Sequence, residues 1–529
     1  MKDTKFTRVA ALVMAIAVVF TMLACSGGGK TPSANEPIVA TKVNTPDAPQ
    51  PGNGGASGTK YEIVENVDTL KDDELRYVMI YNPRVYDENS TYDASSLKTG
   101  YLGMQVDVNA ARADGDETAG YPLSNLPQNF FPPLPEDFEI EQSRADAMGV
   151  EYNVGDIATF RTFNLAMDKR PAVQYVCAYE GQYCHIWTRT TASQARLKAV
   201  ADSFDSKIYK QVTETFGPAR FDSSAGGKGK INLIFAPMDN SVYGYSYTYD
   251  SFATGEVNSY YDSYLLPNYD HDIVFINEGF LEPSFDSDRT LYSTVAHEFQ
   301  HLIMAVAAMN TPNTTLCRSW INESMSGYIE EVIYPGIQVE NERPYSFMTS
   351  KLIRRGQSLY NFKTAEGFLS MDVGVYGSVF VFSDYLTDLA GDDVFTKFHK
   401  YWRESYSSTL SEAEALVNAV SPAAKAEIDN LVEYPVSIAF ADENEEWMSK
   451  LALDFYLSMF AKEGNLNAYQ PIDNSALLYD EINGATIEGG GRIIVAVDGE
   501  FEIPGDADAG LIYIGLDKNF KPVTDFVYK

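Results

Sequence analysis

Two histidines, four residues apart within an apolar helical pattern, constrain this chain more than any other feature. The stretch STVAHEFQHLIMAVAAM, Ser293 to Met309, keeps the apolar spacing of a buried helix and contains His297 and His301, two of the chain's five histidines. Residues four apart stand one turn apart on the same helix face, so both imidazoles can reach one metal ion. Glu298 lies about 100° around the helix, where it can reach a water at that ion without displacing it.

Chance does not explain this pattern. The chain's composition gives about 0.007 expected matches, counting any acidic residue beside the first histidine. The flanking residues also fit a helix, because Ser287 or Asp288 can cap its start and Asn310 with Pro312 ends it. We therefore predict that the motif lies on a helix.

A catalytic zinc site needs a third protein ligand and an open position for water. The downstream segment SWINESMSGYIEEVIYPG supplies it, because Glu323 lies in a second helical pattern after a loop long enough to return toward the first. Glu331 is a competing candidate, but its spacing from His301 is longer. We predict His297, His301 and Glu323 as ligands of one catalytic Zn²⁺, with Glu298 as the catalytic base.

The two segments resemble the gluzincin zinc metallopeptidases. The resemblance rests on HEFQH, followed after 21 intervening residues by Glu323 in the pattern NExxS. The flanking AHEFQHLI and WINESMS are most similar to the hyicolysin family within that group. The similarity covers about Gly155 to Asp393 and is strongest between Thr294 and Glu331.

The resemblance implies an α+β fold with a thermolysin-like catalytic domain, in which a mixed sheet is joined to a helical subdomain. It implies that an edge strand, which we place at DIVFINEG, runs above the zinc and pairs with an extended peptide. It also implies that Glu298 polarises a water for attack on a peptide carbonyl. By the same resemblance Tyr376 is a candidate for stabilising the oxyanion, and a packing role is the alternative.

One position departs from the family's pattern. Gluzincins often carry a carboxylate one turn after the glutamate ligand, where it orients a zinc-bound histidine, but Gly327 stands there. We expect Glu330, two turns after Glu323, to substitute. The remaining histidines are better explained as structural: His185 and His399 show no motif, and His271 begins a strand where proton donation near the cleft is the weaker alternative.

The N-terminal segment has the features of an export signal. Residues 1–25 combine Lys2, Lys5 and Arg8 with an apolar run and end in MLAC, which predicts a bacterial lipoprotein signal with a lipid on Cys25. An ordinary secretory signal is the alternative. Residues 26–60, of which 15 are Gly, Pro or Ser, predict a disordered tether.

Element patterns divide the rest of the chain. We predict a β-rich N-terminal domain with a proline-rich linker over 61–138, the zinc metallopeptidase domain over 155–464, largely helical after Glu323, and a C-terminal β module over 465–529. The segment SQARLKAVADSFDSKIYKQVTETFG predicts a helix starting at Ser193 and ending at Phe216.

Two local patterns carry further predictions. Cys177 and Cys184 flank AYEGQY, and a hairpin turning at Glu180-Gly181 would place them opposite each other, so we predict a disulfide and leave Cys317 as a small buried side chain. In VYGYSYTYD, strict alternation predicts a strand with Tyr243, Tyr245, Tyr247 and Tyr249 on one face, as a half-exposed sheet face or, alternatively, a substrate groove.

The function best supported by these patterns is an exported, lipid-anchored zinc endopeptidase of the cell envelope, expected to be a monomer acting on a protein or peptide substrate. The net charge of −34 argues against a nucleic-acid partner. The alternatives are a metal-containing surface binding protein or adhesin without proteolysis, and a purely structural lipoprotein. The intact Glu298 favours the enzyme, because a binding protein has no need for a base beside its metal.

Overall fold

The computed structural model describes residues 59–65, 67–85, 150–164, 169–221, 229–240, 242–251, 267–309, 317–341, 343–354, 356–362, 374–404, 412–461, 487–503 and 510–529. These residues belong to one compact unit, residues 57–529. The predicted signal segment, nearly all of the predicted tether and the proline-rich linker lie outside the described residues. No helix within the described ranges has the length and apolar character needed to cross a membrane.

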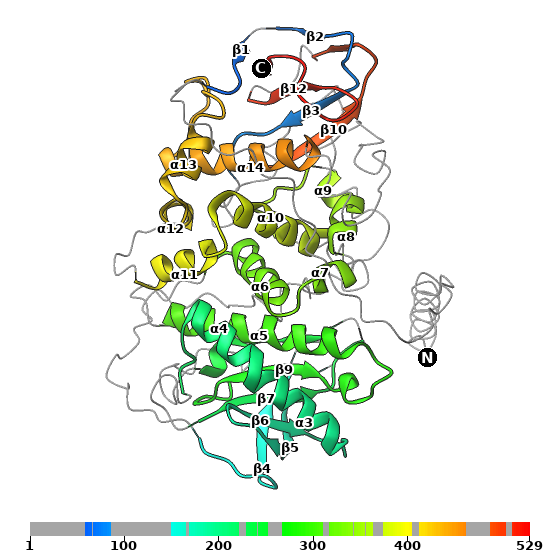
Figure 1. The fold of residues 1–529 in the computed structure, drawn as a ribbon, viewed down its shortest axis with the longest axis vertical. Helices are drawn as coiled ribbons and strands as arrows, with labels where there is room; N and C mark the ends of the chain where they lie inside the picture. Colours follow the sequence, from blue (N-terminus) through cyan, green and yellow to red (C-terminus); the bar gives the residue numbers. More distant parts are fainter. Residues whose placement is uncertain are drawn as a thin grey trace, which may run out of the picture. The chain divides into compact units, whose positions relative to one another are not determined.

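A six-stranded mixed sheet holds the predicted catalytic region, with the strand order β4-β5-β6-β7-β9-β8 (Figure 1). The strands are β4 (Ile157–Arg161), β5 (Ala172–Glu180), β6 (Cys184–Thr188), β7 (Ile231–Ala236), β8 (Gly244–Tyr245) and β9 (Ile273–Asn277). Strands β6, β7 and β9 are mutually parallel, whereas β4, β5 and β8 run antiparallel to their neighbours. Every residue of β7 and β9 is buried, because both faces of the central sheet are covered.

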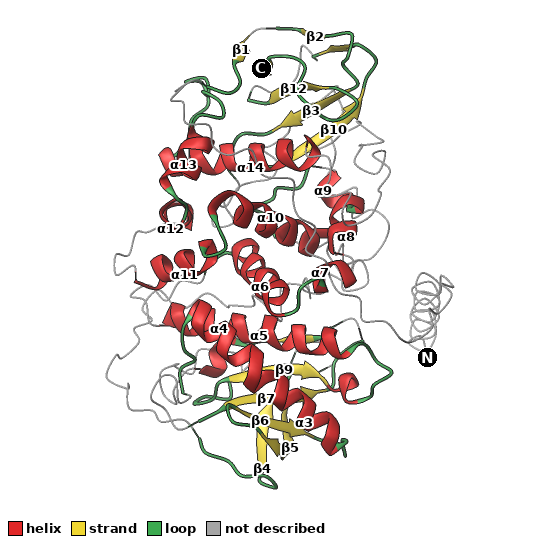
Figure 2. Cartoon of the chain, in the orientation of Figure 1, coloured by secondary structure: helices red, strands yellow, loops and turns green. Residues whose placement is uncertain are grey.

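Helices cover one face of this sheet (Figure 2). They are α3 (Gln194–Ser203), the π-helical turn η4 (Phe204–Ile208), α4 (Tyr209–Phe216) and α5 (Asp288–Met309). The helix predicted to start at Ser193 and end at Phe216 is confirmed, with the π-helical turn as an addition. That turn places Asp205, which accepts hydrogen bonds from the backbone N–H groups of Gln182 and Tyr183 at the β5–β6 turn. The opposite face of the sheet packs on a second core that includes Trp187.

Helices follow from residue 319 to 461, as predicted. They are α6 (Ser319–Ile333), α7 (Ile337–Glu340), α8 (Arg343–Thr349), α9 (Lys351–Arg354), α10 (Gly374–Ala390), α11 (Val394–Glu404), α12 (Glu412–Ala419), α13 (Pro422–Asp429) and α14 (Glu443–Ala461). The first of them, α6, packs against α5 and α10. Between β9 and α5 lies the short 3-10 helix η7 (Glu278–Leu281).

The two ends of the described chain form one sheet, which corrects the prediction of separate N- and C-terminal β modules. Its order is β1-β13-β12-β3-β10, beside a two-stranded pair β11-β2. The strands are β1 (Ile63–Glu65), β2 (Thr69–Lys71), β3 (Tyr77–Tyr81), β10 (Arg492–Ala496), β11 (Glu500–Glu502), β12 (Ile512–Leu516) and β13 (Phe526–Tyr528). Because β3 lies between β12 and β10, the C-terminal strands are joined through an N-terminal one. The Tyr81 hydroxyl donates to the carbonyl of Ser449, which ties this sheet to α14.

The predicted disulfide is wrong, although the predicted hairpin is present. Cys177 pairs with Trp187 rather than with Cys184, because the turn falls after Glu180 and a bulge interrupts β5. The two thiols face opposite sides of the sheet, since Cys177 lies in the core with Trp187 and Cys184 lies in the core beneath the helices. Both are free, as is Cys317, and all three are buried.

The predicted row of tyrosines is also wrong. Only Gly244 and Tyr245 form a strand, and the chain then turns into the 3-10 helix η6 (Thr248–Ser251). Tyr245 and Tyr247 are buried, whereas Tyr243 is exposed. The tyrosines therefore do not form a half-exposed sheet face, because alternation ends after two residues.

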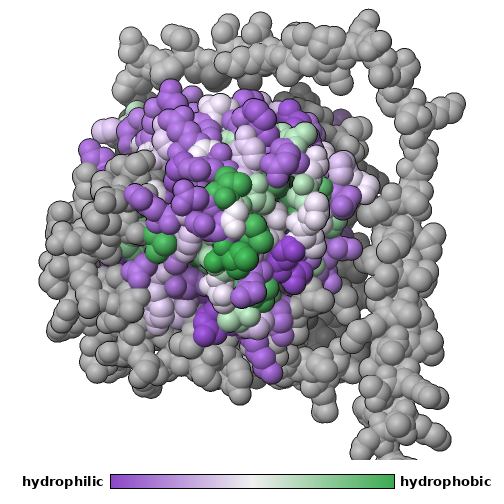
Figure 3. All heavy atoms as spheres, turned by 90° about the horizontal axis from the view of Figure 1, so that it is seen from below, coloured by the Kyte–Doolittle hydropathy of each residue, from purple (hydrophilic) through white to green (hydrophobic). Residues whose placement is uncertain are grey.

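Strand β4 forms the outer edge of the sheet at the opposite side from β8. Its Ile157 pairs with Val176 of β5, and both side chains are exposed. A view from this end of the molecule shows a small group of apolar side chains among polar ones (Figure 3). The backbone of Arg161, at the end of this edge, is hydrogen-bonded by the Asn268 side chain, which shortens the open edge.

The cysteine arrangement yields a test. After unfolding without a reductant, Cys177, Cys184 and Cys317 should each react with iodoacetamide, whereas in the native protein they should react slowly because burial raises the pKa of each thiol. Peptide mass spectrometry measures both states. Recovery of a peptide pair linked through Cys177 and Cys184 would contradict the register described above.

Candidate metal centre

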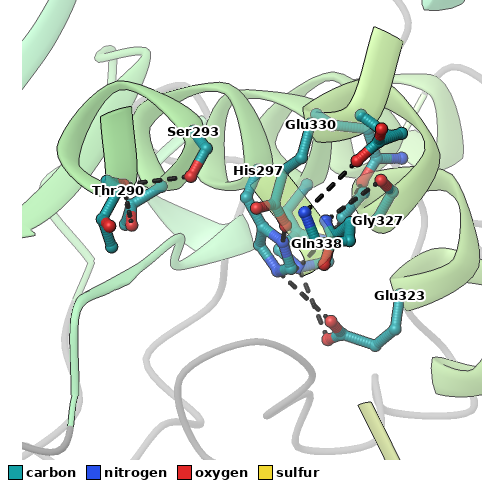
Figure 4. Close-up of polar contacts among 12 residues, drawn as sticks. Thr290, Ser293, His297, Glu323, Gly327, Glu330 and Gln338 are labelled. Carbon is teal, nitrogen blue, oxygen red and sulfur yellow. Dashed lines mark hydrogen bonds and ion pairs between the residues drawn. The ribbon is translucent and has the colours of Figure 1, made fainter. Parts of the chain in front are cut away.

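Helices α5 and α6 bring the three predicted ligands to one point. Nε2 of His297 lies 3.2 Å from Oε2 of Glu323, and Nε2 of His301 lies 3.4 Å from Oε1 of the same carboxylate. The two Nε2 atoms are 3.0 Å apart. Figure 4 shows His297 and the carboxylate of Glu323 facing each other. Ser287 starts α5 as predicted, by accepting a hydrogen bond from the N–H of Thr290.

These separations fit a zinc ion. Tetrahedral zinc with bonds of about 2.0–2.2 Å to nitrogen and oxygen places its ligand atoms about 3.3 Å from one another. One ligand atom from each of His297, His301 and Glu323 can be chosen so that all lie within 4.8 Å of one another. All three side chains are buried, so the site needs little rearrangement to enclose a cation.

The charges of the site also favour a cation. Burial alone raises the pKa of Glu323, but His301 and His297 outweigh it and lower that pKa to about 2. Burial lowers the pKa of His297, yet hydrogen bonds to Glu323 and Glu330 outweigh this and raise it well above its ordinary value. Carboxylates buried this deeply require positive charge beside them, which either a proton on His297 or a divalent ion in its place supplies.

Glu330 contacts His297 as the sequence analysis expected. Its Oε1 lies 2.6 Å from Nδ1 of His297, the ring nitrogen that faces away from the other ligands. A carboxylate at Nδ1 holds the proton on that nitrogen and leaves Nε2 free to bind metal. Gly327 instead faces α10, where a Cβ would lie 3.8 Å from Phe380. The orienting carboxylate has thus moved one turn further along α6.

At Nδ1, His301 contacts a hydroxyl group rather than a carboxylate. Oγ of Ser326 lies 3.3 Å from Nδ1 of His301 and donates a hydrogen bond to Oε1 of Gln300 at 2.5 Å. Gln300 was not among the predicted site residues. No signal in the sequence distinguishes it, because its partner Ser326 lies 26 residues further along the chain.

One carboxylate oxygen of Glu298 has no hydrogen bond from any described residue. The side chain is 2% exposed, and its Oε2 is buried with no hydrogen-bond partner among the described residues. Burial raises the pKa of Glu298 to about 7, against the opposing effect of His297 and His301. A carboxylate that titrates near neutral pH is suited to accept and release a proton.

The other polar candidates have structural contacts. The carboxylate of Glu331 accepts hydrogen bonds from the backbone N–H groups of Gly336 and Gln338, beyond the end of α6. His271 is bound through Nε2 to the Tyr152 hydroxyl at 2.8 Å. His185 and His399 are both buried, and the structure places neither with the three ligands.

Two predictions derived from the resemblance have different outcomes. The strand DIVFINEG, now β9, is not the edge of the sheet, because β8 pairs along it through Gly244 and Tyr245. The strand nearest Glu298 at the edge is therefore β8.

Tyr376 lies near the start of α10, with Phe362 and the Arg343 guanidinium each 4.9 Å from its ring. Its role in catalysis stays a prediction.

Comparison with known proteins adds one relative. No protein-family model matches the chain. Over 284 residues it is 25% identical to the neutral metalloprotease ShpI of Staphylococcus hyicus, a match that covers 50% of this chain and 58% of the relative. The chain thus spans less than two thirds of that relative's length. Its similarity to a metalloprotease supports a zinc metallopeptidase-type site.

A solved structure was also found, that of yeast LTA4 hydrolase in complex with bestatin. The similarity has a TM-score of 0.29 and 14% identity and covers 45% of this chain and 34% of that chain. At that level it carries no argument about the fold. The described helices and sheets show a mixed α and β chain, and the thermolysin-like arrangement stays a prediction.

The contact between Glu330 and His297 predicts a defined loss of zinc affinity. Glu330→Gln should weaken zinc binding about 10- to 100-fold, because Gln holds the Nδ1 proton less strongly and aligns the ring less well. Competition with a chromophoric chelator measures the affinity. Glu331→Gln is the matched control, since Glu331 lies next to Glu330 but its hydrogen bonds are to backbone N–H groups. A second variant, His301→Ala, should lose the metal because it removes a ligand. Unchanged affinity in Glu330→Gln would show that the contact does not orient the ligand.

Proposed function

We propose that this chain is a zinc-dependent endopeptidase that hydrolyses peptide bonds with a metal-activated water and Glu298 as the base. The observation that supports this most directly is that Glu298 is buried and interacts electrostatically with His297, His301 and Glu323, whose ligand atoms converge. Similarity to a neutral metalloprotease supports the same class of reaction.

The three ligands and Glu298 have different roles in the proposed reaction. His297, His301 and Glu323 would hold the ion, which when bound lowers the pKa of a water and polarises a carbonyl oxygen. Oε2 of Glu298 accepts the proton of the attacking water as its oxygen bonds to the peptide carbon. Glu298 then delivers that proton to the leaving nitrogen as the carbon–nitrogen bond breaks, so the carboxylate ends ionised as it began.

The same geometry argues against a purely metal-holding protein. A binding protein or adhesin with this fold would need the three ligands and Glu330, but no further buried carboxylate beside them. Leaving Glu298 buried costs free energy, because burial opposes its charged form. We infer that Glu298 stays buried in spite of this unfavourable free energy because it is needed for catalysis. Tyr376 as an oxyanion donor and a thermolysin-like catalytic domain are parts of the same proposal.

Export and a lipid anchor on Cys25 complete the proposal. They rest on the basic start, apolar run and MLAC of residues 1–25. Labelling cells with a fatty-acid analogue should mark the full-length protein and not Cys25→Ala, while both are exported. Equal labelling of the two proteins would contradict the anchor, and failure of both to leave the cytoplasm would contradict the signal.

The central test separates binding from catalysis. Glu298→Gln should keep about one zinc per chain and lose cleavage of an unstructured protein such as casein by about 10²- to 10⁴-fold, because the amide cannot accept the proton. Metal analysis and a peptide-release assay measure the two properties on one preparation. A zinc-loaded wild-type protein that is inert on a broad substrate panel would support the binding protein instead.

A further inference from the structure

Strand β8 lies directly over the stem of Glu298. Gly244 of β8 pairs with Ile276 of β9, and a Cβ placed on it would be 2.9 Å from Cγ of Glu298. The same Cβ would lie 2.9 Å from the carbonyl oxygen of Phe275 and 3.0 Å from Cγ2 of Thr294. No side chain fits there unless one of these groups moves.

Backbone conformation does not explain the glycine. Eight described glycines have positive φ, and Gly244 is not among them. An alanine could therefore adopt the same backbone angles without strain. Space alone accounts for the absence of a side chain at this position.

Strand β8 is also fixed in place, so it cannot retreat from a larger residue. The ring of Tyr245 stacks on Phe275 with centroids 4.4 Å apart, and its hydroxyl accepts a hydrogen bond from the N–H of Phe163. The side-chain amide of Asn277 donates to the carbonyl of Val242 at 2.7 Å, just before the strand. These contacts are buried, which makes them costly to break.

The carboxylate of Glu298 is the more movable partner. Its Oε2 has no hydrogen-bond partner among the described residues, so packing around the stem sets where it lies. Thr294, one turn earlier on α5, is held by a hydrogen bond from its hydroxyl to the carbonyl of Thr290. The methyl group of Thr294 and the Glu298 stem, together with the Phe275 carbonyl, leave no room for a side chain on Gly244.

We propose that Gly244 is a positioning residue, which sets the place of the Glu298 carboxylate relative to His297 and His301. The inference rests on the proposed function and adds a residue to its machinery. A Cβ at this position would press on the Glu298 stem as well as on the Phe275 carbonyl and the Thr294 methyl group, and none of its three nearest atoms belongs to a ligand. A displacement of about 1 Å can lower a catalytic rate about 10²-fold.

The test compares zinc-loaded variants of the full chain. Gly244→Ala should lower kcat about 10- to 100-fold, with KM within about threefold and zinc content unchanged. Gly515→Ala is the matched control, because Gly515 also lies in a strand, β12 of the other sheet, and its Cβ would meet the Thr524 side chain at 2.7 Å without involving Glu298. That variant should keep the wild-type kcat. Gly244→Ala/Thr294→Ser should recover part of the loss, because it removes the methyl group that the new Cβ would meet at 3.0 Å.

Crystal structures of the zinc-loaded wild type and Gly244→Ala give a readout independent of activity. The Glu298 carboxylate should shift by more than about 0.5 Å, the tolerance of a catalytic group. An unmoved carboxylate, or a kcat equal to that of the wild type, overturns the proposal. If Gly244→Ala does not fold, the double variant takes its place in both measurements. If the wild type cleaves no peptide, the proposed function fails, and the position of the carboxylate alone decides the role of Gly244.

Discussion

The burial of three carboxylates and two imidazoles between α5 and α6 is the constraint on which the rest of the structure depends. Glu298, Glu323 and Glu330 lose water at this site, and each is stable there only beside hydrogen-bond donors or positive charge. His297 meets two of them, one at each ring nitrogen. Such an arrangement tolerates little movement, so the scaffold must hold α5 and α6 at a fixed separation and rotation.

The mixed sheet and its helices meet that requirement from the other side of α5. Phe299, next to Glu298, points away from the site and packs on Phe204 and Tyr209, with ring centroids 5.3 and 6.0 Å away. Successive residues of an α-helix are rotated by about 100° around its axis. The packing of Phe299 in the core therefore also fixes the directions of the side chains of Glu298 and His297. The π-helical turn η4 carries Phe204, which couples the hairpin contact of Asp205 to the same packing.

What the sequence could predict was local. The helical spacing of HEFQH, its cap at Ser287 and the second helix with Glu323 are encoded within a few turns, and the structure has each of them. The errors arise where pairing spans longer distances or where one residue changes a register. Strand β3 pairs with β10 across some 400 residues, and the register of the hairpin, in which Glu180 pairs with His185, places Cys177 opposite Trp187. The apolar periodicity of a strand does not by itself predict the strand that it pairs with or the register of the pairing.

Two glycines beside the site show why a sequence alone cannot assign such positions. Both lie inside regular elements, where a glycine could mark flexibility, close packing or a lost functional side chain. At Gly327 a Cβ would have ordinary contacts with Phe380 at 3.8 Å, so a small side chain would fit and the missing carboxylate is instead replaced by Glu330. At Gly244 a Cβ would collide with Glu298, so the absence of a side chain is itself the requirement. The first glycine is replaceable because another residue took over its role, and the second is not, because its role is to leave space.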